Sequence, residues 1–212
     1  MVFPSVYDMT NESMTTVRKQ HFWEYFSGDS VNSRWRTIYN NQGANIIAIN
    51  DAVDGGAIIT TATGSGDNGS INFNNIHQFS HNSSVCISVW RQPTNTSVVS
   101  FVGLTSNLNK WDTSSERSIV VAKSANTNYQ LRTASGLAVS EGTDGSVAID
   151  TSFHTFKMVL GASNNTVSID GVADITKTTD LPDIALEPYI GMETLTTASR
   201  TTEIMYYEAY NT

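Results

Sequence analysis

The sequence predicts an all-β protein in which two antiparallel sheets pack face to face. Its composition points this way, because 26 Thr, 25 Ser and 19 Asn among 212 residues suit strands and turns and are poor helix formers. From His21 onward, short β-branched and aromatic runs alternate with Gly, Asn, Asp or Ser clusters roughly every eight to twelve residues, which is typical of sandwiches and barrels. A sustained helical period is absent, and a charged fraction of 15% disfavours coiled coils and charge-driven disorder.

Fourteen runs are expected to form strands, a number that requires two packed sheets. In chain order they are His21–Phe26, Trp35–Tyr39, Asn45–Asn50, Ala57–Ala62, Ser70–Phe73, Ser84–Arg91, Ser97–Leu104, Arg117–Lys123, Tyr129–Ala134, Phe153–Leu160, Thr166–Asp170, Val172–Lys177, Pro188–Thr194 and Thr202–Tyr210.

Turn chemistry supports these strands, and the clearest hairpin is Thr166–Thr176. Within that hairpin Val167, Ile169 and Val172 are expected on the buried side. The predicted turn sequences are Asp54-Gly55-Gly56, Asp144-Gly145 and Asp170-Gly171, with Asn164-Asn165 as a further candidate.

Residues 1–20 differ from the rest because they contain no alternating apolar run. They are interpreted as an N-terminal arm, followed by one sandwich domain at residues 21–212. Such an arm is expected to dock on a neighbouring subunit and to order on assembly. No signal peptide is expected, since a basic and then an apolar N-terminal region is missing, and no apolar run approaches the about 20 residues of a membrane span.

Charge and cysteine content narrow the possible partners and chemistry. A net charge of −8 and a pI near 4.8 argue against nucleic acid, since phosphate backbones would be repelled. The single cysteine, Cys86, cannot form an internal disulfide and is expected to be a small buried strand residue.

Three segments together resemble concanavalin A-like, laminin G-like jelly rolls. His21–Trp35 is similar to the family's aromatic opening strand and its Gly-Asp turn, and Phe153–Leu160 with Thr166–Gly171 looks like its "W-H-T" strand and "D-G" hairpin. Leu181-Pro182, followed by Glu187–Ile190, resembles the return to the opposite sheet. The resemblance implies two antiparallel sheets of about six or seven strands, one of them concave. Enzymes, lectins, receptor domains and viral surface proteins share this fold, so it does not decide function.

Catalytic chemistry is not expected from the carboxylates. A retaining glycosidase needs two of them about 5–5.5 Å apart, which on this fold come from one strand as Glu-x-Asp-x-x-Glu. Glu203 and Glu208 are five positions apart and are therefore expected on opposite faces of their strand. None of the four histidines lies in a recognisable catalytic motif, so lyase chemistry is not expected either, and the chain is predicted to be non-enzymatic.

Carbohydrate binding requires an exposed aromatic platform beside amides or guanidinium groups. Ser88 and Trp90 share one strand face, as do Gln130 and Arg132. If both strands belong to the concave sheet, these four side chains line its groove. The alternative is that Trp90 is covered by a loop or by a second subunit. Trp111, between two strands, is a second aromatic candidate with the same ambiguity.

Calcium is the one cofactor with a candidate site, at the rim of the sandwich. Asp51, Asp54 and Asp67 flank the predicted strand Ala57–Ala62 and would supply the oxygen ligands of a hard cation. The alternative is that these residues are ordinary turn formers that need no metal, and no other cofactor is expected.

Two functions remain open at this point. The first is a virion structural protein at the virion surface: a phage or viral capsid decoration, fibre or tail-associated subunit. Its lectin-like jelly roll would contact copies of itself or other virion proteins and also attach to a host glycan. The second is a free carbohydrate-binding module or lectin. A polysaccharide-degrading enzyme is a further alternative. The virion hypothesis rests on the resemblance, the missing export signal and the missing catalytic pair.

Overall fold

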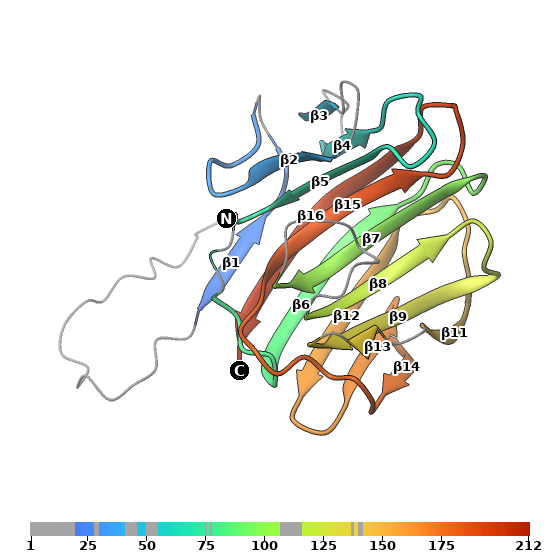
Figure 1. Cartoon of the computed structure of the whole chain (residues 1–212). Helices are drawn as coiled ribbons and strands as arrows, with labels where there is room; N and C mark the ends of the chain where they lie inside the picture. Colours follow the sequence, from blue (N-terminus) through green and yellow to red (C-terminus); the bar gives the residue numbers. More distant parts are fainter. Residues whose placement is uncertain are drawn as a thin grey trace.

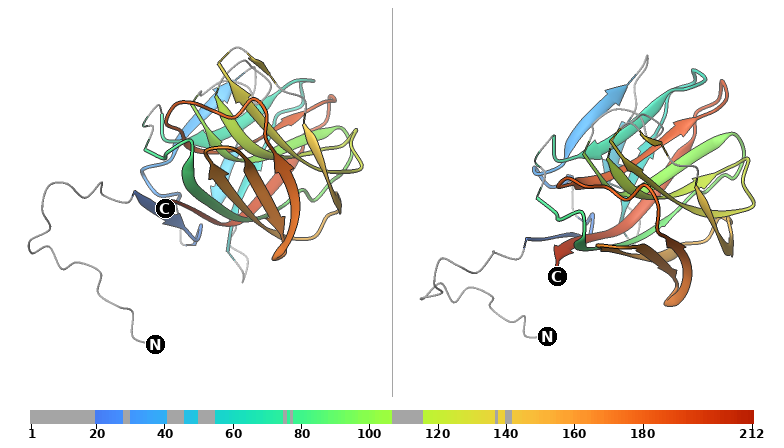
Figure 2. Two further views of the ribbon diagram at one scale, coloured as in Figure 1. Left: turned by 90° about the horizontal axis from the view of Figure 1, so that it is seen from below. Right: turned by 60° about the horizontal axis from the view of Figure 1, so that its bottom comes forward.

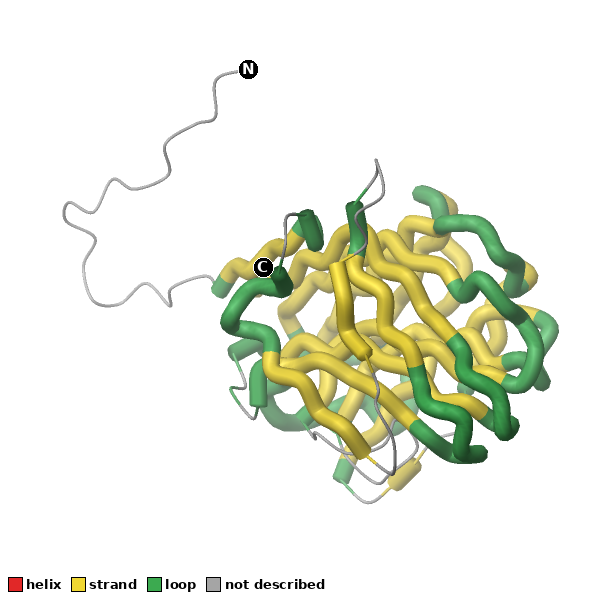
Figure 3. Tube along the Cα trace, turned by 90° about the horizontal axis from the view of Figure 1, so that it is seen from above, coloured by secondary structure: helices red, strands yellow, loops and turns green. Residues whose placement is uncertain are grey.

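The computed structural model describes residues 20–27, 30–40, 46–49, 55–74, 76, 78–106, 116–136, 138–139 and 142–212. Within these ranges there are sixteen strands and no helix. The strands form two stacked sheets of eight, with loops at the ends of the layers (Figures 1 and 3). The predicted all-β jelly-roll sandwich is confirmed.

The first sheet has β6 and β16 at its centre, and all of its strand pairs are antiparallel. In spatial order it contains β14 (Val172–Lys177), β13 (Asn165–Ile169), β12 (His154–Gly161), β6 (Ser83–Arg91), β16 (Thr201–Asn211), β4 (Ala57–Thr60) and β3 (Ile46–Ile49), while β1 (His21–Glu24) also pairs with β16.

The second sheet has β7 and β15 at its centre and is also antiparallel. In spatial order it contains β10 (Ala138–Val139), β9 (Asn128–Ser135), β8 (Arg117–Lys123), β7 (Val98–Thr105), β15 (Glu187–Thr194), β5 (Asn68–Asn72) and β2 (Arg36–Asn40), while β11 (Thr143–Ala148) pairs with β9.

The strand β16 carries two neighbours on the same side. Its first half pairs with β4, and its second half pairs with β1, so that His21 faces Tyr210 and Trp23 faces Glu208. Figure 2 shows β1 beside the C-terminal end of β16 in both views. The two ends of the described chain therefore lie side by side in the first sheet.

A single apolar core fills the space between the sheets. It is rich in aromatic rings, and Trp35 packs edge-on against Phe22 at 5.3 Å and against Tyr207 at 5.3 Å between ring centroids. The hydroxyl of Tyr207, a residue of the first sheet, donates a hydrogen bond of 2.8 Å to the carbonyl of Gly103 in the second. Burial of these large side chains supplies most of the attraction between the layers.

All fourteen predicted strands exist, and the sequence missed two, β10 and β11. The prediction of a turn at Asp144-Gly145 is wrong, because both residues lie inside β11, where the pairing with β9 becomes irregular. The turn at Asp170-Gly171 is confirmed, with φ angles of 51° and 82°. Val172 is 69% exposed rather than buried, because it lies at the tip of that hairpin on an edge strand.

Cys86 is buried in the core, as predicted, and burial raises the pKa of its thiol to about 12. The proposed arm at residues 1–20 lies outside the described residues, apart from Gln20, so it stays a prediction. Within the described part of the chain, no helix is long and apolar enough to cross a membrane.

Candidate functional site

The predicted carbohydrate groove does not form as expected, because its two strands lie in different sheets. Ser88 and Trp90 belong to β6 of the first sheet and point into the core. Trp90 is 1% exposed, and its ring stacks on Phe156 at 5.0 Å and meets Tyr129 edge-on at 6.0 Å. Ser88 and Trp90 therefore cannot contact a ligand. The alternation of β6 was predicted, but both of its faces carry apolar residues, so the sequence could not show which face is inside.

Gln130 and Arg132 do lie together, on the outer face of the second sheet. The Nε and Nη2 atoms of Arg132 donate to Gln130 Oε1 at 3.3 and 3.2 Å. Gln130 Nε2 in turn donates to Asp144 Oδ1 of the neighbouring β11 at 2.6 Å. The three side chains form a continuous polar group, which we call the Gln130 group. Asp144 is exposed and Arg132 is half-buried, so the group reaches the surface.

The centre of the same face is apolar. Val99, Phe101, Ile119, Val121 and Tyr189 form a second buried cluster, separate from the main core. The rings of Phe101 and Tyr189 stack at 5.0 Å. These side chains are at most 2% exposed, so they offer no aromatic platform, and their outward positions on β7 and β8 are not carboxylates.

The expectation that Glu203 and Glu208 point to opposite faces is wrong. A bulge at Met205 shifts the register of β16, so that Glu203 pairs with Arg91 and Glu208 with Ile87, two residues on the same face of β6. Arg91 and Ile87 are four residues apart on an extended strand, which places their backbones about 13 Å apart. That backbone separation is larger than the roughly 5–9.5 Å between the carboxyl groups of a glycosidase pair. Glu203 instead pairs with Arg91 at 2.7 Å.

The calcium candidates are divided between described and undescribed residues. Asp67 is 3% exposed, and its carboxylate accepts a hydrogen bond of 2.6 Å from the amide of Gly64, which fits a turn-forming role. Asp51 and Asp54 lie outside the described residues, and so does the aromatic candidate Trp111. No group of three or more metal-binding side chains occurs among the residues that are described. Calcium therefore stays a prediction.

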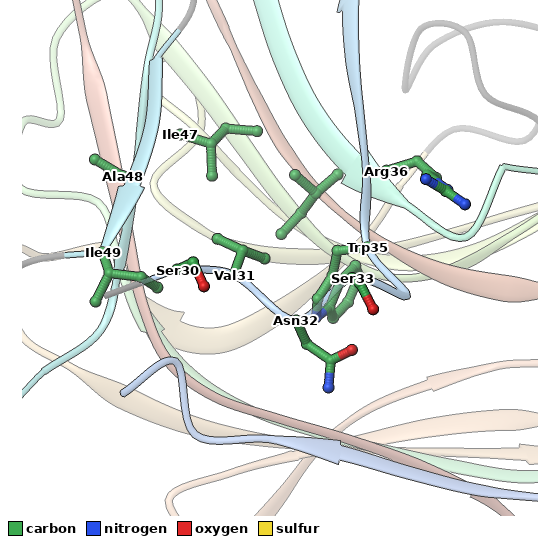
Figure 4. A pocket seen from close by; sticks show the side chains of 10 residues that line it. Ser30, Val31, Asn32, Ser33, Trp35, Arg36, Ile47, Ala48 and Ile49 are labelled. Atoms are coloured by element: carbon green, nitrogen blue, oxygen red, sulfur yellow. The ribbon is translucent and has the colours of Figure 1, made fainter. Parts of the chain in front are cut away.

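A pocket of about 570 Å³ opens at the edge of the sandwich, between the segment before β2 and strand β3. In Figure 4, Ile47 and Ile49 lie on one side of it, and Asn32, Ser33 and Arg36 lie on the other. Trp35 and Ile71, which are part of the core, also line it. The volume is within the range of small-molecule sites.

The sequence analysis missed a group of aromatic side chains on the outer face of the first sheet. Trp23 and Tyr25 are 56% and 60% exposed, and Tyr25 packs against Tyr206 with 4.7 Å between ring centroids. The pattern that could have revealed them is the alternation of His21, Trp23 and Tyr25 within one strand.

No family model and no curated protein matches this sequence. Solved structures do match in fold. The Bacillus licheniformis beta-glucanase is 12% identical, covers 91% of this chain and 98% of its own, and has a TM-score of 0.66. A Bacteroides ovatus mixed-linkage-glucan GH16, solved with its product, is 13% identical over 88% and 98% of the two chains with a TM-score of 0.63. A Crh5 transglycosylase in complex with NAG is 18% identical over 90% and 84% with a TM-score of 0.66.

These similarities establish the fold, a concanavalin A-like jelly roll of the kind found in GH16 beta-glucanases. They contradict the prediction of a non-enzymatic virion subunit, because the solved structures that share this architecture include glucanases and transglycosylases. That prediction rested on the resemblance and on a missing catalytic pair, and neither distinguishes a virion protein from other users of the fold. The predicted location at a virion surface depended on the same hypothesis.

Proposed function

We propose that this chain acts on polysaccharides and holds a glycan on the outer face of the second sheet at the Gln130 group. Two observations support this proposal. Several solved structures with this fold carry the names of glucan-active enzymes. The chain itself presents a guanidinium, an amide and a carboxylate, joined by hydrogen bonds, on that face.

The connected hydrogen bonds of the Gln130 group are the observation that carries the proposal. Sugar hydroxyls both donate and accept hydrogen bonds, and they are recognised by side chains whose positions are already fixed. Gln130 is held from both sides, by Arg132 on its own strand and by Asp144 on β11, so its orientation is set before any ligand arrives. Arg132 thus places a guanidinium, and Asp144 a carboxylate, beside a chain lying across β9 and β11.

The proposal is tested by mixing the full chain with soluble mixed-linkage β-glucan, laminarin and xyloglucan. Binding is followed by affinity electrophoresis, and bond cleavage is followed by the release of reducing ends. Arg132→Gln should weaken binding of the preferred glycan about five- to twentyfold, as expected when a charged hydrogen-bond donor is lost.

Arg36→Gln is the matched control. Arg36 is an exposed arginine of β2 in the same sheet, five strands from β9 and therefore about 24 Å away. A wild-type chain that neither binds nor cleaves any of the three glycans would contradict the proposed function. Equal losses in both arginine variants would contradict the assignment to the Gln130 group.

A further inference from the structure

The outer face of the first sheet carries a stripe of aromatic side chains where β1 pairs with β16. His21, Trp23 and Tyr25 point outward from the first strand and its extension, while Phe22 and Phe26 enter the core. On β16, Tyr206, Glu208 and Tyr210 lie on the same outer face. These six residues are called the aromatic surface below. Strand alternation alone produces this division between core and surface.

The rings of the aromatic surface contact one another in pairs. Tyr25 lies 4.7 Å from Tyr206 and 5.7 Å from Trp23, and His21 lies 5.8 Å from Tyr210 between ring centroids. Trp23 and Tyr25 still expose more than half of their area. Large exposed rings are costly to leave in water, and mutual packing holds these in fixed positions.

A carboxylate lies among the rings and is fixed by two of them. Glu208 accepts a hydrogen bond of 2.8 Å from Tyr206, and its other oxygen lies 2.8 Å from Nε2 of His21. Burial, together with the neighbouring Glu208, raises the pKa of Tyr206, so its hydroxyl keeps its proton and remains a donor. The aromatic surface therefore combines flat apolar rings with a fixed acceptor that is 19% exposed.

The size and charge of the aromatic surface narrow its possible partners. It extends about 14 Å along the strands, with three side chains on each of two strands. A stable protein interface needs about 800 Å² and 20–30 residues on each partner, which six side chains do not supply. An anionic membrane is disfavoured by Glu208 and by the net charge of −8. A pyranose fits both the aromatic rings and the carboxylate of Glu208. Its C–H face stacks on aromatic rings, and its hydroxyls donate hydrogen bonds to a carboxylate.

We infer that the aromatic surface is a second carbohydrate-binding site, which takes a short stretch of uncharged pyranose chain lying along β1 and β16. The sugar faces rest on Trp23 and Tyr25, and a hydroxyl donates to Glu208. A uronic acid or sulfated sugar is rejected because its negative charge would approach the carboxylate of Glu208. This site lies on the opposite sheet from the Gln130 group, and it does not depend on that group's proposed role.

The test uses cellohexaose and laminarihexaose as uncharged probes and hexagalacturonate as the charged probe. Binding is measured by calorimetry, and the indole N–H resonance of Trp23 is followed by NMR, assigned with the Trp23→Phe variant. Uncharged probe should shift that resonance in the wild type. Trp23→Ala and Tyr25→Ala should each weaken binding about five- to tenfold, as for loss of one stacked aromatic contact. Glu208→Gln should admit the charged probe, which the wild type excludes.

Val172→Ala is the matched control, since Val172 is an exposed apolar residue of the same sheet that lies outside the aromatic surface. Arg132→Gln separates this inference from the proposed function. If Arg132→Gln weakens binding but Trp23→Ala and the Trp23 resonance show no effect, the second site is refuted and the proposed function stands. Equal binding of charged and uncharged probes would overturn the role of Glu208. No shift of the Trp23 resonance with either uncharged probe would overturn the site.

Discussion

Nδ1 of His154, the first residue of β12, lies 2.6 Å from Oδ2 of Asp170 in the turn between β13 and β14. On the other side of the ring, Nε2 lies 3.0 Å from Oδ1 of Asp150. Both ring nitrogens face carboxylates, so both must carry a proton for the two hydrogen bonds to form at once. The imidazolium thus ties the segment before β12 to the β13–β14 hairpin.

Stability is predicted to depend on pH through His154. Burial alone would lower the pKa of His154, but the hydrogen bonds and charges of Asp170 and Asp150 outweigh it and raise the pKa. A raised folded-state pKa stabilises the protein fully below the unfolded value of about 6.5, and that stabilisation is lost as the pH rises through the folded value. Urea unfolding at several pH values should therefore show a smaller free energy of unfolding at pH 9 than at pH 5.5.

At low pH this stabilisation is lost because Asp150 and Asp170 become protonated. The amide of Ser152 and the ring of His154 lower the pKa of Asp150. For Asp170, burial opposes the shift, but hydrogen bonds from His154 and Thr155 lower its pKa. Their contribution is present above about pH 4 and is lost as the pH falls through the lowered values. His154→Asn should remove the difference between pH 5.5 and pH 9. An unchanged difference in that variant would show that other groups cause it.

Trp90 should behave as a core residue. Trp90→Ala removes a ring that is 1% exposed and stacked on Phe156, and such changes cost about 3–5 kcal/mol. The midpoint of chemical denaturation measures this loss directly. Trp23→Ala is the comparison, and it should cost about 1 kcal/mol or less because Trp23 is 56% exposed. Similar losses in the two variants would contradict the placement of Trp90 between the sheets.

The hydroxyl of Tyr207 should contribute to stability across the two sheets. Tyr207→Phe keeps the buried ring but removes the hydrogen bond to the carbonyl of Gly103, at a cost of about 1–3 kcal/mol. Tyr210→Phe, on the outer face of the same strand, should change the free energy of unfolding by about 0.5 kcal/mol or less. Equilibrium unfolding in urea compares the two. A Tyr207→Phe variant as stable as the wild type would contradict the bond's role.

Cys86 should be unreactive in the folded protein. Its thiol is buried and burial raises its pKa to about 12, so almost no thiolate forms at pH 8. Alkylation by iodoacetamide at pH 8 should be slow in buffer and complete within minutes in strong denaturant, as followed by mass spectrometry. Rapid native labelling at the single thiol would mean that the core around β6 opens frequently.

The sequence alone determined fourteen of the sixteen described strands and the side-chain alternation of those without a bulge. Thr/Ser/Asn content, short β-branched runs and the Asp170-Gly171 turn are local properties, and each acts within a few neighbouring residues. The all-β sandwich and the adjacency of Gln130 and Arg132 followed from these. Gln130 and Arg132 are adjacent because residues two positions apart on a strand lie on the same face.

Only the tertiary structure decided which face of each strand is inside and which strands share a sheet. β6 has apolar residues on both faces, so the stacking of the first sheet on the second, where Trp90 meets Tyr129 of β9, placed Trp90 in the core. The bulge at Met205 brought Glu203 and Glu208 to one face, and the pairing of β1 with β16 assembled the aromatic surface from residues about 185 positions apart. These contacts join segments that are far apart in the sequence, so no local pattern encodes them. Their free energy comes from burial and strand register, which exist only in the folded chain.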